Sequence, residues 1–402
     1  MSECVMCSSE IKTNKPVVIF TDTLFNANGR WSEHLNSDLV CSTSCLTELL
    51  QDEDGNWLDD SGDIVMPAVP VFLGEIKLPG DTRANRLDLA SWLVDVDSGA
   101  GGLTARVFAN RIWYILFGKG LSTSLEDFGG QGTPPSHPEL LDSLAVYFYE
   151  KNWDVKQLIR LIVHSRTYQL SSIPTDEVLE KDPLNELFSR QDRYRLGAEF
   201  IRDNALEIGG LLYNEEVGGP SVKPYQPLGY YRHLNFPTRK YVHSKGSSQY
   251  RRGLYVHWQR MFLHPMMKAM DAPTREECTA QRPRSNTPTS ALVLLNDPTF
   301  LEAALGFAKR VLTQAPQPFE ERLDYAFKTA LSRAPNLLEK QLLGELLKTT
   351  TQVYQENPGY DAQFLGSTGQ VTPSGSVDTI ELVAWTAVAR AILNLNETNS
   401  RN

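Results

Sequence analysis

Apolar residues recur at the three- and four-residue spacing of amphipathic helices over most of the chain from residue 85 onward. One such stretch runs from Thr104 to Phe117 and is followed by Gly118, a residue suited to closing a helix. Its predicted inward-facing residues are Val107, Phe108, Ile112, Trp113, Ile115 and Leu116. The predicted helices comprise a short segment from about residue 85 and then 104–117, 136–150, 154–164, 196–213, 288–312, 319–332, 337–354 and 378–394. The pattern predicts a mainly α, multi-helix domain.

Two local features refine this prediction. Ser136 and Glu139 have the spacing of a capping box, in which the serine hydroxyl accepts from the glutamate amide at the start of a helix. Residues 214–262 are instead rich in Gly, Pro, Tyr and Arg, and within them Gly253–His257 has the pattern of a strand. The helical domain is therefore predicted to contain a short, irregular, β-containing insert.

The first 50 residues follow a different pattern, because they hold four of the five cysteines around a β-rich stretch at residues 16–21. The cysteines form two close pairs, Cys4 with Cys7 and Cys41 with Cys45. Two such pairs supply the four thiolates of a structural, tetrahedral zinc site. Two disulfides or free thiols are the alternatives, and a reducing compartment disfavours the disulfides. Ser8 stands where covalent haem attachment requires histidine, so no covalent haem is expected.

The second cysteine pair precedes an apolar stretch that places Cys45 in the first turn of a helix. This arrangement resembles the treble-clef zinc fingers and implies a small α+β module. The chain is accordingly divided into a four-cysteine zinc module at 1–50, an acidic and proline-containing linker at 51–84, and the helical domain at 85–402.

Composition narrows the classes of partner. The 402 residues carry a formal net charge of −10, which argues against general binding to nucleic acid or to an anionic membrane. No apolar run approaches the roughly 18–20 residues of a spanning helix. The N-terminus lacks the basic start and apolar stretch of a secretory signal, so the chain as written is expected to be cytoplasmic.

Histidine and carboxylate residues provide one set of candidates for acid–base chemistry. His137 could act with Asp127 or Glu139, although a hydrogen bond at a helix start is the favoured interpretation. His164 is predicted to end a helix, where the dipole favours a cation. The nucleophile-elbow, zinc-protease and nucleotide-binding motifs are absent from the sequence, which leaves open whether the protein is an enzyme.

A second set of candidates is basic. Arg275, Arg282 and Arg284, together with Asn286, form a cluster whose guanidinium groups suit carboxylate, sulfate or phosphate oxygens. The alternative is an internal ion-pair network with neighbouring acids, namely Asp271, Glu276 and Glu277. Aromatic residues at 224–231 and Trp258 could stack on sugars or simply pack.

Two more residues are interpreted from their neighbours. Arg111 lies in a helix rich in aromatic residues and is expected to be buried in a pair with Asp127 or Glu199. Cys278 is expected to be a buried apolar residue rather than a nucleophile.

Dense motifs recur in order through the helical domain. They are Leu103–Trp113, Phe117–Gly120, Asp127–Gly129, Pro134–Asp142, His164–Tyr168, Arg195–Asp203, Gly218–Tyr225, Tyr250–Tyr255, Asp271–Thr279, Arg282–Pro288 and Ala291–Pro298. In this order they resemble the planctomycete-type C-terminal domain of unknown function (domain of unknown function 1553) over about residues 66–398.

The resemblance implies relatives in Planctomycetes and Verrucomicrobia that are usually exported. Many carry a cytochrome-c-like domain or are encoded near sulfatase-like proteins, which links them to polysaccharide processing. No catalytic residues come with the resemblance. The leading hypothesis is a binding or accessory domain for an anionic glycan or a partner protein. The alternatives are an enzyme acting on a sulfated or carboxylated polysaccharide and an accessory to a haem-c electron-transfer partner.

Overall fold

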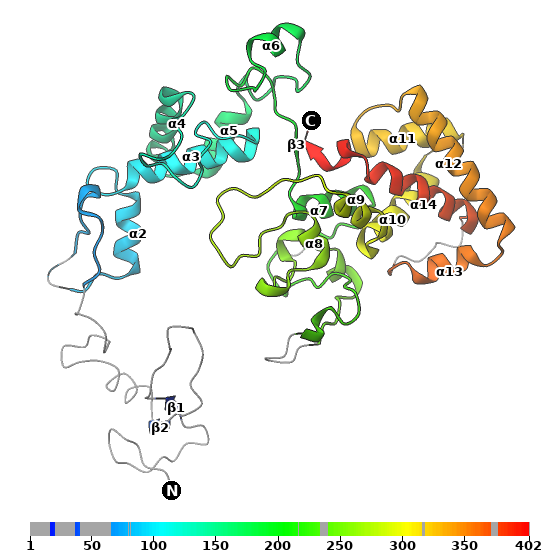
Figure 1. Cartoon of the computed structure of the whole chain (residues 1–402), viewed down its shortest axis with the longest axis horizontal. Coiled ribbons are helices and arrows are strands. Elements are labelled where there is room, and N and C mark those ends of the chain that lie inside the picture. Colours follow the sequence, from blue (N-terminus) through cyan, green and yellow to red (C-terminus); the bar gives the residue numbers. More distant parts are fainter. Residues whose placement is uncertain are drawn as a thin grey trace. The chain divides into compact units, whose positions relative to one another are not determined.

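The computed structural model describes residues 17–20, 37–40, 66–78, 80, 82–215, 217–233, 240–315, 318–370 and 377–401 (Figure 1). The chain divides into two compact units, Met1–Gly101 and Gly102–Asn402. The four cysteines proposed to bind zinc, the predicted helix that begins at Cys45 and the acidic segment at 51–63 lie outside the described residues.

The N-terminal unit contains two short strands and one described α-helix. Strands β1 (Val17–Phe20) and β2 (Ser37–Val40) pair antiparallel, with Val17 opposite Val40. Helix α2 (Arg86–Val94) begins at Asn85, whose side chain accepts from the backbone N–H of Leu87. Trp92 is its buried residue, and the indole N–H donates to the Leu73 carbonyl at 3.2 Å.

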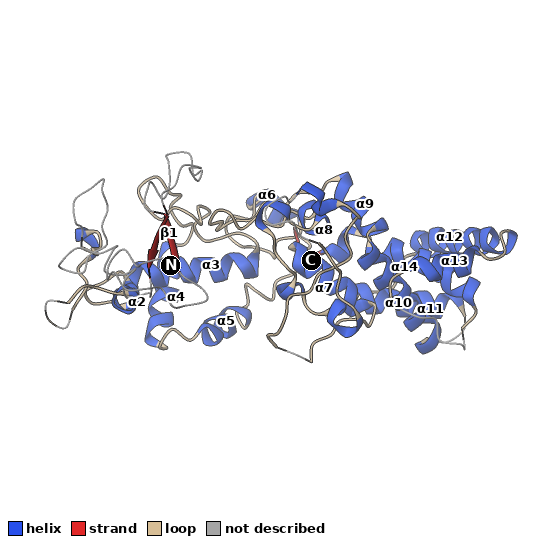
Figure 2. Cartoon of the chain, turned by 90° about the horizontal axis from the view of Figure 1, so that it is seen from below, coloured by secondary structure: helices blue, strands red, loops and turns tan. Residues whose placement is uncertain are grey.

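The second unit is mainly α, which confirms the predicted fold class (Figure 2). Its helices are α3 (Gly101–Phe117), α4 (Pro138–Glu150), α5 (Val155–Val163), α6 (Asp176–Lys181), α7 (Ala198–Ile208), α8 (Pro265–Ala269), α9 (Pro288–Asn296), α10 (Pro298–Gln314), α11 (Phe319–Leu331), α12 (Leu337–Glu356), α13 (Tyr360–Ser367) and α14 (Thr379–Leu393). Two-residue strands β3 (Tyr194–Arg195) and β4 (Ser400–Arg401) pair antiparallel. The short helices α6, α8 and α13 were not predicted, because they are too brief to show a clear period.

Two hydrophobic cores stabilise this unit. The first lies among α3, α4 and α5, where the rings of Trp113 and Phe117 stack 4.2 Å apart and Phe148 is buried. The second surrounds α10, which packs against α7, α9, α11 and α14. Phe300 and Phe307 of α10 are almost fully buried in it. Burial on several sides makes α10 the central helix of the second core.

The helix predicted at 288–312 is two helices. Asp297 ends α9 and begins α10, and its carboxylate accepts from the Thr299 backbone N–H at 2.9 Å. Pro298 occupies the first position of α10. Proline lacks the N–H that a continuous helix would need there, so the helix predicted at 288–312 is interrupted at this point. The two helices are bent by 55° at this break.

The predicted capping box at Ser136 is wrong. The residue that begins α4 is His137, and the Ser136 hydroxyl bonds to His137 Nδ1 at 2.9 Å instead of to the amide of Glu139. Pro138 takes the first helical position, so the capping residue is His137, one residue later than the predicted Ser136.

The strand predicted at residues 253–257 is also wrong. Gly253–Tyr255 is a short 3-10 helix, and Val256 forms an isolated bridge with Val222. A side chain on Gly253 would come within 2.8 Å of the Glu199 backbone, so this segment is pressed against α7 rather than paired in a sheet.

Three inward-facing predictions for α3 fail as well. Val107 and Ile115 are 37% and 53% exposed, and Arg111 is exposed without either expected carboxylate partner. The apolar face of α3 is narrower than its composition suggests, because one side of the helix packs against α4 and α5.

In the described part of the chain, no single helix is both long and apolar enough to cross a membrane. Helices α9 and α10, which are bent relative to each other, are long and apolar enough only when they are counted together.

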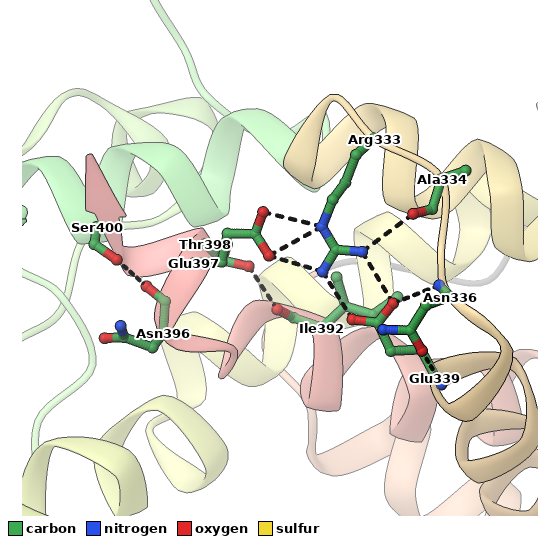
Figure 3. A network of polar contacts seen from close by, with 9 residues as sticks. All are labelled: Arg333, Ala334, Asn336, Glu339, Ile392, Asn396, Glu397, Thr398 and Ser400. Carbon is green, nitrogen blue, oxygen red and sulfur yellow. Dashed lines mark hydrogen bonds and ion pairs between the residues drawn. The ribbon is translucent and has the colours of Figure 1, made fainter. Parts of the chain in front are cut away.

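Arg333 joins three elements near the C-terminus (Figure 3). Its Nε and Nη2 donate to the Glu397 carboxylate, at 3.0 and 2.7 Å, and its Nη1 and Nη2 donate to the Glu339 carboxylate, at 2.9 and 2.7 Å. Glu339 and Asn336 also form the capping box of α12. These bonds lower the pKa of Glu339 and raise that of Arg333. The guanidinium therefore ties the end of α11 to the start of α12 and to the residues after α14.

We expect Arg333→Ala to lower the free energy of unfolding by about 1–2 kcal/mol, because a partly exposed side chain loses several charge-assisted hydrogen bonds. Urea denaturation would measure the change. Arg111→Ala, which removes an exposed arginine, should change stability by less than about 0.5 kcal/mol. Equal stabilities for the two variants would contradict the role assigned to Arg333.

Candidate functional site

A buried arginine connects the insert to the helical core. Arg202 of α7 is fully buried, and its Nη1 and Nη2 donate to the carbonyls of Arg251 and Gln249, both at 2.7 Å. Arg251 is itself buried and donates to the carbonyls of Pro220 and Gly218. Three of the sequence motifs, at 195–203, 218–225 and 250–255, thus meet in one hydrogen-bond network.

Burial sets the protonation of the groups in this network. Desolvation lowers the pKa of Arg202 to about 10, so the guanidinium stays charged at neutral pH. Desolvation raises the pKa of Asp203, whose carboxylate accepts from the Gly253 N–H at 2.6 Å. It also raises the pKa of Asp297 to about 6, although a hydrogen bond from Thr299 and the charge of Arg202 oppose the shift.

A second part of the network is built on α10. Glu302 is 1% exposed and accepts from the Tyr250 hydroxyl at 2.7 Å and from the Gln370 backbone N–H. His264 Nε2 bonds to the Tyr225 carbonyl at 2.7 Å, and burial lowers the pKa of His264 to about 4. A neutral imidazole with a backbone partner is a structural arrangement at neutral pH, so this part mainly orders the insert.

These buried polar residues were not singled out from the sequence. One signal was present, since Arg202 lies on the apolar face of α7 between Ile201 and Ala205, where a charge is unexpected. Glu302 likewise falls among the buried residues of α10.

The predicted basic cluster lies on a long loop between α8 and α9, which we call the arginine loop (residues 272–284; yellow-green in Figure 1). The loop is closed at its base, where Asp271 accepts from the Ser285 backbone N–H at 2.6 Å and from its hydroxyl. Arg195 donates to the Ser285 carbonyl at 2.7 Å. These bonds hold the two ends together, as in a compact Ω-loop.

Two of the loop arginines stack on aromatic rings. The Arg275 guanidinium lies 3.9 Å from the ring centroid of Trp258, whose indole N–H donates to the Pro273 carbonyl at 3.0 Å. The Arg284 guanidinium lies 4.4 Å from the Tyr194 ring and 5.0 Å from the Tyr114 ring. Trp258 therefore positions the first half of the loop as well as its arginine.

The third arginine, Arg282, forms an ion pair with Glu199 of α7 at 2.8 Å. Among the residues that the structure describes, no ion pair joins a loop arginine to the three acids considered as internal partners, namely Asp271, Glu276 and Glu277. Asn286, which follows the base of the loop, is exposed.

This arrangement leaves guanidinium hydrogen-bonding capacity at the surface. Arg275 and Arg284 are exposed, and a guanidinium stacked on a ring still presents its N–H groups along its edge. Within the described ranges neither has a carboxylate partner. Such groups can form paired hydrogen bonds with a carboxylate or sulfate.

The prediction that Cys278 is buried is wrong, because its side chain is exposed. It lies on the arginine loop, of which only Ala272, at the start, packs against the core around α10.

The residues proposed for acid–base chemistry have separate partners. His137 bonds to Ser136, the Asp127 carboxylate accepts from the Gly129 N–H at 2.7 Å, and Glu139 is exposed in the first turn of α4. No described hydrogen bond or ion pair joins these three residues. The described residues also contain no group of three His, Cys, Asp or Glu side chains that could hold a metal ion. An enzymatic role stays a prediction that no contact favours, and the haem-c accessory role likewise stays a prediction.

Comparison with known proteins finds one family. The model for "PSD1: Protein of unknown function (DUF1553)" matches residues 85–347. No curated protein and no solved structure matches the chain.

Because the pKa of Asp297 is raised, we predict that the effect of Asp297→Asn on the free energy of unfolding depends on pH. Asparagine is chosen because its side chain can still cap α10. The folded-state pKa of about 6 lies above the unfolded value of 3.8. Protonation of Asp297 therefore stabilises the fold below pH 3.8, and this contribution is lost as the pH rises through 6.

On going from pH 7 to pH 5, wild type gains stability as Asp297 takes up a proton, and Asp297→Asn does not. We therefore expect the free energy of unfolding of the variant, relative to wild type, to be lower at pH 5 than at pH 7 by about 1 kcal/mol. Urea denaturation at the two pH values would measure it. Subtracting the free energy of unfolding of wild type from that of the variant at each pH cancels the pH dependence that other groups, such as His264, contribute to both proteins. A difference that does not change with pH would contradict the assignment.

Proposed function

The chain belongs to the PSD1 family of proteins of unknown function (DUF1553), and we propose that it is a binding domain for an acidic polysaccharide, linked to polysaccharide processing. The proposed ligand carries carboxylate or sulfate groups. The arginine loop is the proposed binding site, with Arg275 and Arg284 as the residues that contact the acidic groups.

One observation carries this proposal. Arg275 and Arg284 are exposed on a loop with a closed base, and each guanidinium is supported by an aromatic ring rather than neutralised by a carboxylate. A restrained arginine loses less conformational entropy on binding than a free one. The support from Trp258 and Tyr194 therefore favours recognition of an anion over an internal structural role.

The overall charge helps to distinguish the class of ligand. A net charge of −10 disfavours a long polyanion such as nucleic acid, which needs many clustered cations along its backbone. A few arginines beside aromatic rings suit a polymer whose acidic groups are spaced along sugar units, because the rings offer apolar faces to sugars.

We also propose that Cys4, Cys7, Cys41 and Cys45 hold a structural zinc ion. The fit rests on the donor set, since four thiolates suit tetrahedral zinc. Support comes from β1 and β2, which pair in the segment between the two cysteine pairs, with β2 ending one residue before Cys41. Zinc bound by four thiolates would stabilise this small module and would not provide a catalytic position.

Binding to immobilised polymers tests the loop. We expect wild type to bind dextran sulfate or polygalacturonate and not neutral dextran, and Arg275→Ala/Arg284→Ala to weaken binding by about tenfold or more, because two charge-assisted contacts are lost. Biolayer interferometry would measure affinity, and circular dichroism would verify folding.

The matched control is Arg86→Ala/Arg111→Ala, which removes the same charge from exposed arginines on α2 and α3. It should retain most of the affinity. Equal losses in the two double variants would indicate non-specific attraction, and no binding by wild type would reject the proposed function.

Metal analysis tests the zinc proposal. We expect one zinc ion per wild-type chain by mass spectrometry, and loss of that zinc in Cys41→Ser, because three thiolates leave the site incomplete. Cys278→Ser is the matched control and should keep its zinc, since Cys278 is an exposed thiol on the arginine loop. A Cys41→Ser protein that retained both its zinc and its fold would rule out the four-cysteine site.

A further inference from the structure

A surface hollow of about 450 Å³ lies at the α4–α5 hairpin, and none of its lining residues belongs to the arginine loop. It is lined by Tyr147, Gln157, Arg160, Leu161, His164 and Ser165. Its volume is within the range of small-molecule sites.

One face of α5 supplies most of the lining. Gln157, Arg160, Leu161 and His164 follow the i, i+3, i+4, i+7 spacing that places side chains on one side of a helix. The opposite side of α5 is fixed in the core, where Leu158 and Ile162 are almost fully buried. The hollow therefore has a rigid wall.

The hollow has basic side chains available for an anion. Arg160 and His164 are exposed, and in the described part of the chain neither side chain has a hydrogen-bond or ion-pair partner. Lys151 is not one of the lining residues, but its Nζ lies 5.8 Å from the centroid of the Tyr147 ring, which is one of them. Arg160 lies in the last turn of α5, where the helix dipole stabilises its positive charge.

The remaining lining suits a sugar ring. Tyr147 and Leu161, the latter 43% exposed, provide apolar surface against which a ring can pack. Gln157 Nε2 donates to Asp154, which leaves its carbonyl oxygen free to accept from a hydroxyl. Ser165 Oγ accepts from the Tyr168 N–H, which leaves its own proton free to donate.

From these groups we infer that the hollow binds an acidic sugar, a pyranose that carries a carboxylate or a sulfate ester. Arg160 and His164 contact the acidic group, Tyr147 and Leu161 pack against the ring, and Gln157 and Ser165 bond to hydroxyls. The inference deepens the proposed function and rests on it for the class of ligand. The residues of the hollow are different from those of the arginine loop. It makes the hollow a second subsite for the same kind of polymer.

Isothermal titration calorimetry of the full chain tests the inference with glucuronic acid, glucose 6-sulfate and neutral glucose. Wild type should bind at least one of the two acids and should not bind glucose. Whichever acid binds identifies the acidic group. Arg160→Ala should weaken binding by about tenfold or more, because a bidentate, charge-assisted contact is lost.

A second variant, Leu161→Glu, places a carboxylate in the hollow at an exposed position and should abolish binding of the acid by repulsion. Arg111→Ala is the matched control and should bind like wild type. No binding by wild type, equal binding of glucose, or unchanged binding by Arg160→Ala and Leu161→Glu would overturn the inference.

The loop variant separates the two proposals. Arg275→Ala/Arg284→Ala should bind the acidic monosaccharide normally while losing affinity for the polymer. If this variant loses the monosaccharide and Arg160→Ala retains it, the hollow is rejected and the loop stands. If Arg160→Ala loses the monosaccharide and the loop variant still binds the polymer like wild type, the hollow stands and the loop is rejected.

Discussion

The hydrogen bonds from the buried Arg202 guanidinium to the carbonyls of Gln249 and Arg251 hold the irregular insert on the helical core. The insert needs such partners because its described residues form isolated bridges instead of a sheet, so its backbone groups must be satisfied individually. Burying a charge is costly, and here the cost is offset by charge-assisted hydrogen bonds to two carbonyls. The buried Arg251 guanidinium likewise donates to two carbonyls, those of Gly218 and Pro220.

The position of the proposed binding loop depends on this constraint. Arg202 holds Arg251, the chain continues from there to Trp258, and Trp258 bonds to Pro273 and lies beneath Arg275. A series of contacts thus links the buried Arg202 of α7 to the exposed Arg275.

Arginine has two roles in this unit, and its partners distinguish them. Arg202, Arg333 and Arg390 donate to carbonyls or carboxylates and join segments that are distant in sequence. Arg275 and Arg284 lie on aromatic rings at the surface and have no carboxylate partner among the described contacts, although Arg284 also donates to the Gly118 carbonyl at 3.4 Å. The same residue type thus serves the fold in one setting and is suited to ligand recognition in the other.

Local sequence determined most of the helices, because the apolar period and the residues at helix boundaries act within a few residues: Gly118 follows α3, and Asp154 and Asn336 cap the starts of α5 and α12. The sequence also identified the basic cluster and the motifs that meet around Arg202. Tertiary structure alone decided which arginines are buried, that residues 253–255 press against α7, and that Cys278 is exposed. These outcomes depend on contacts between residues far apart in the chain, and a pattern of neighbouring residues does not contain that information.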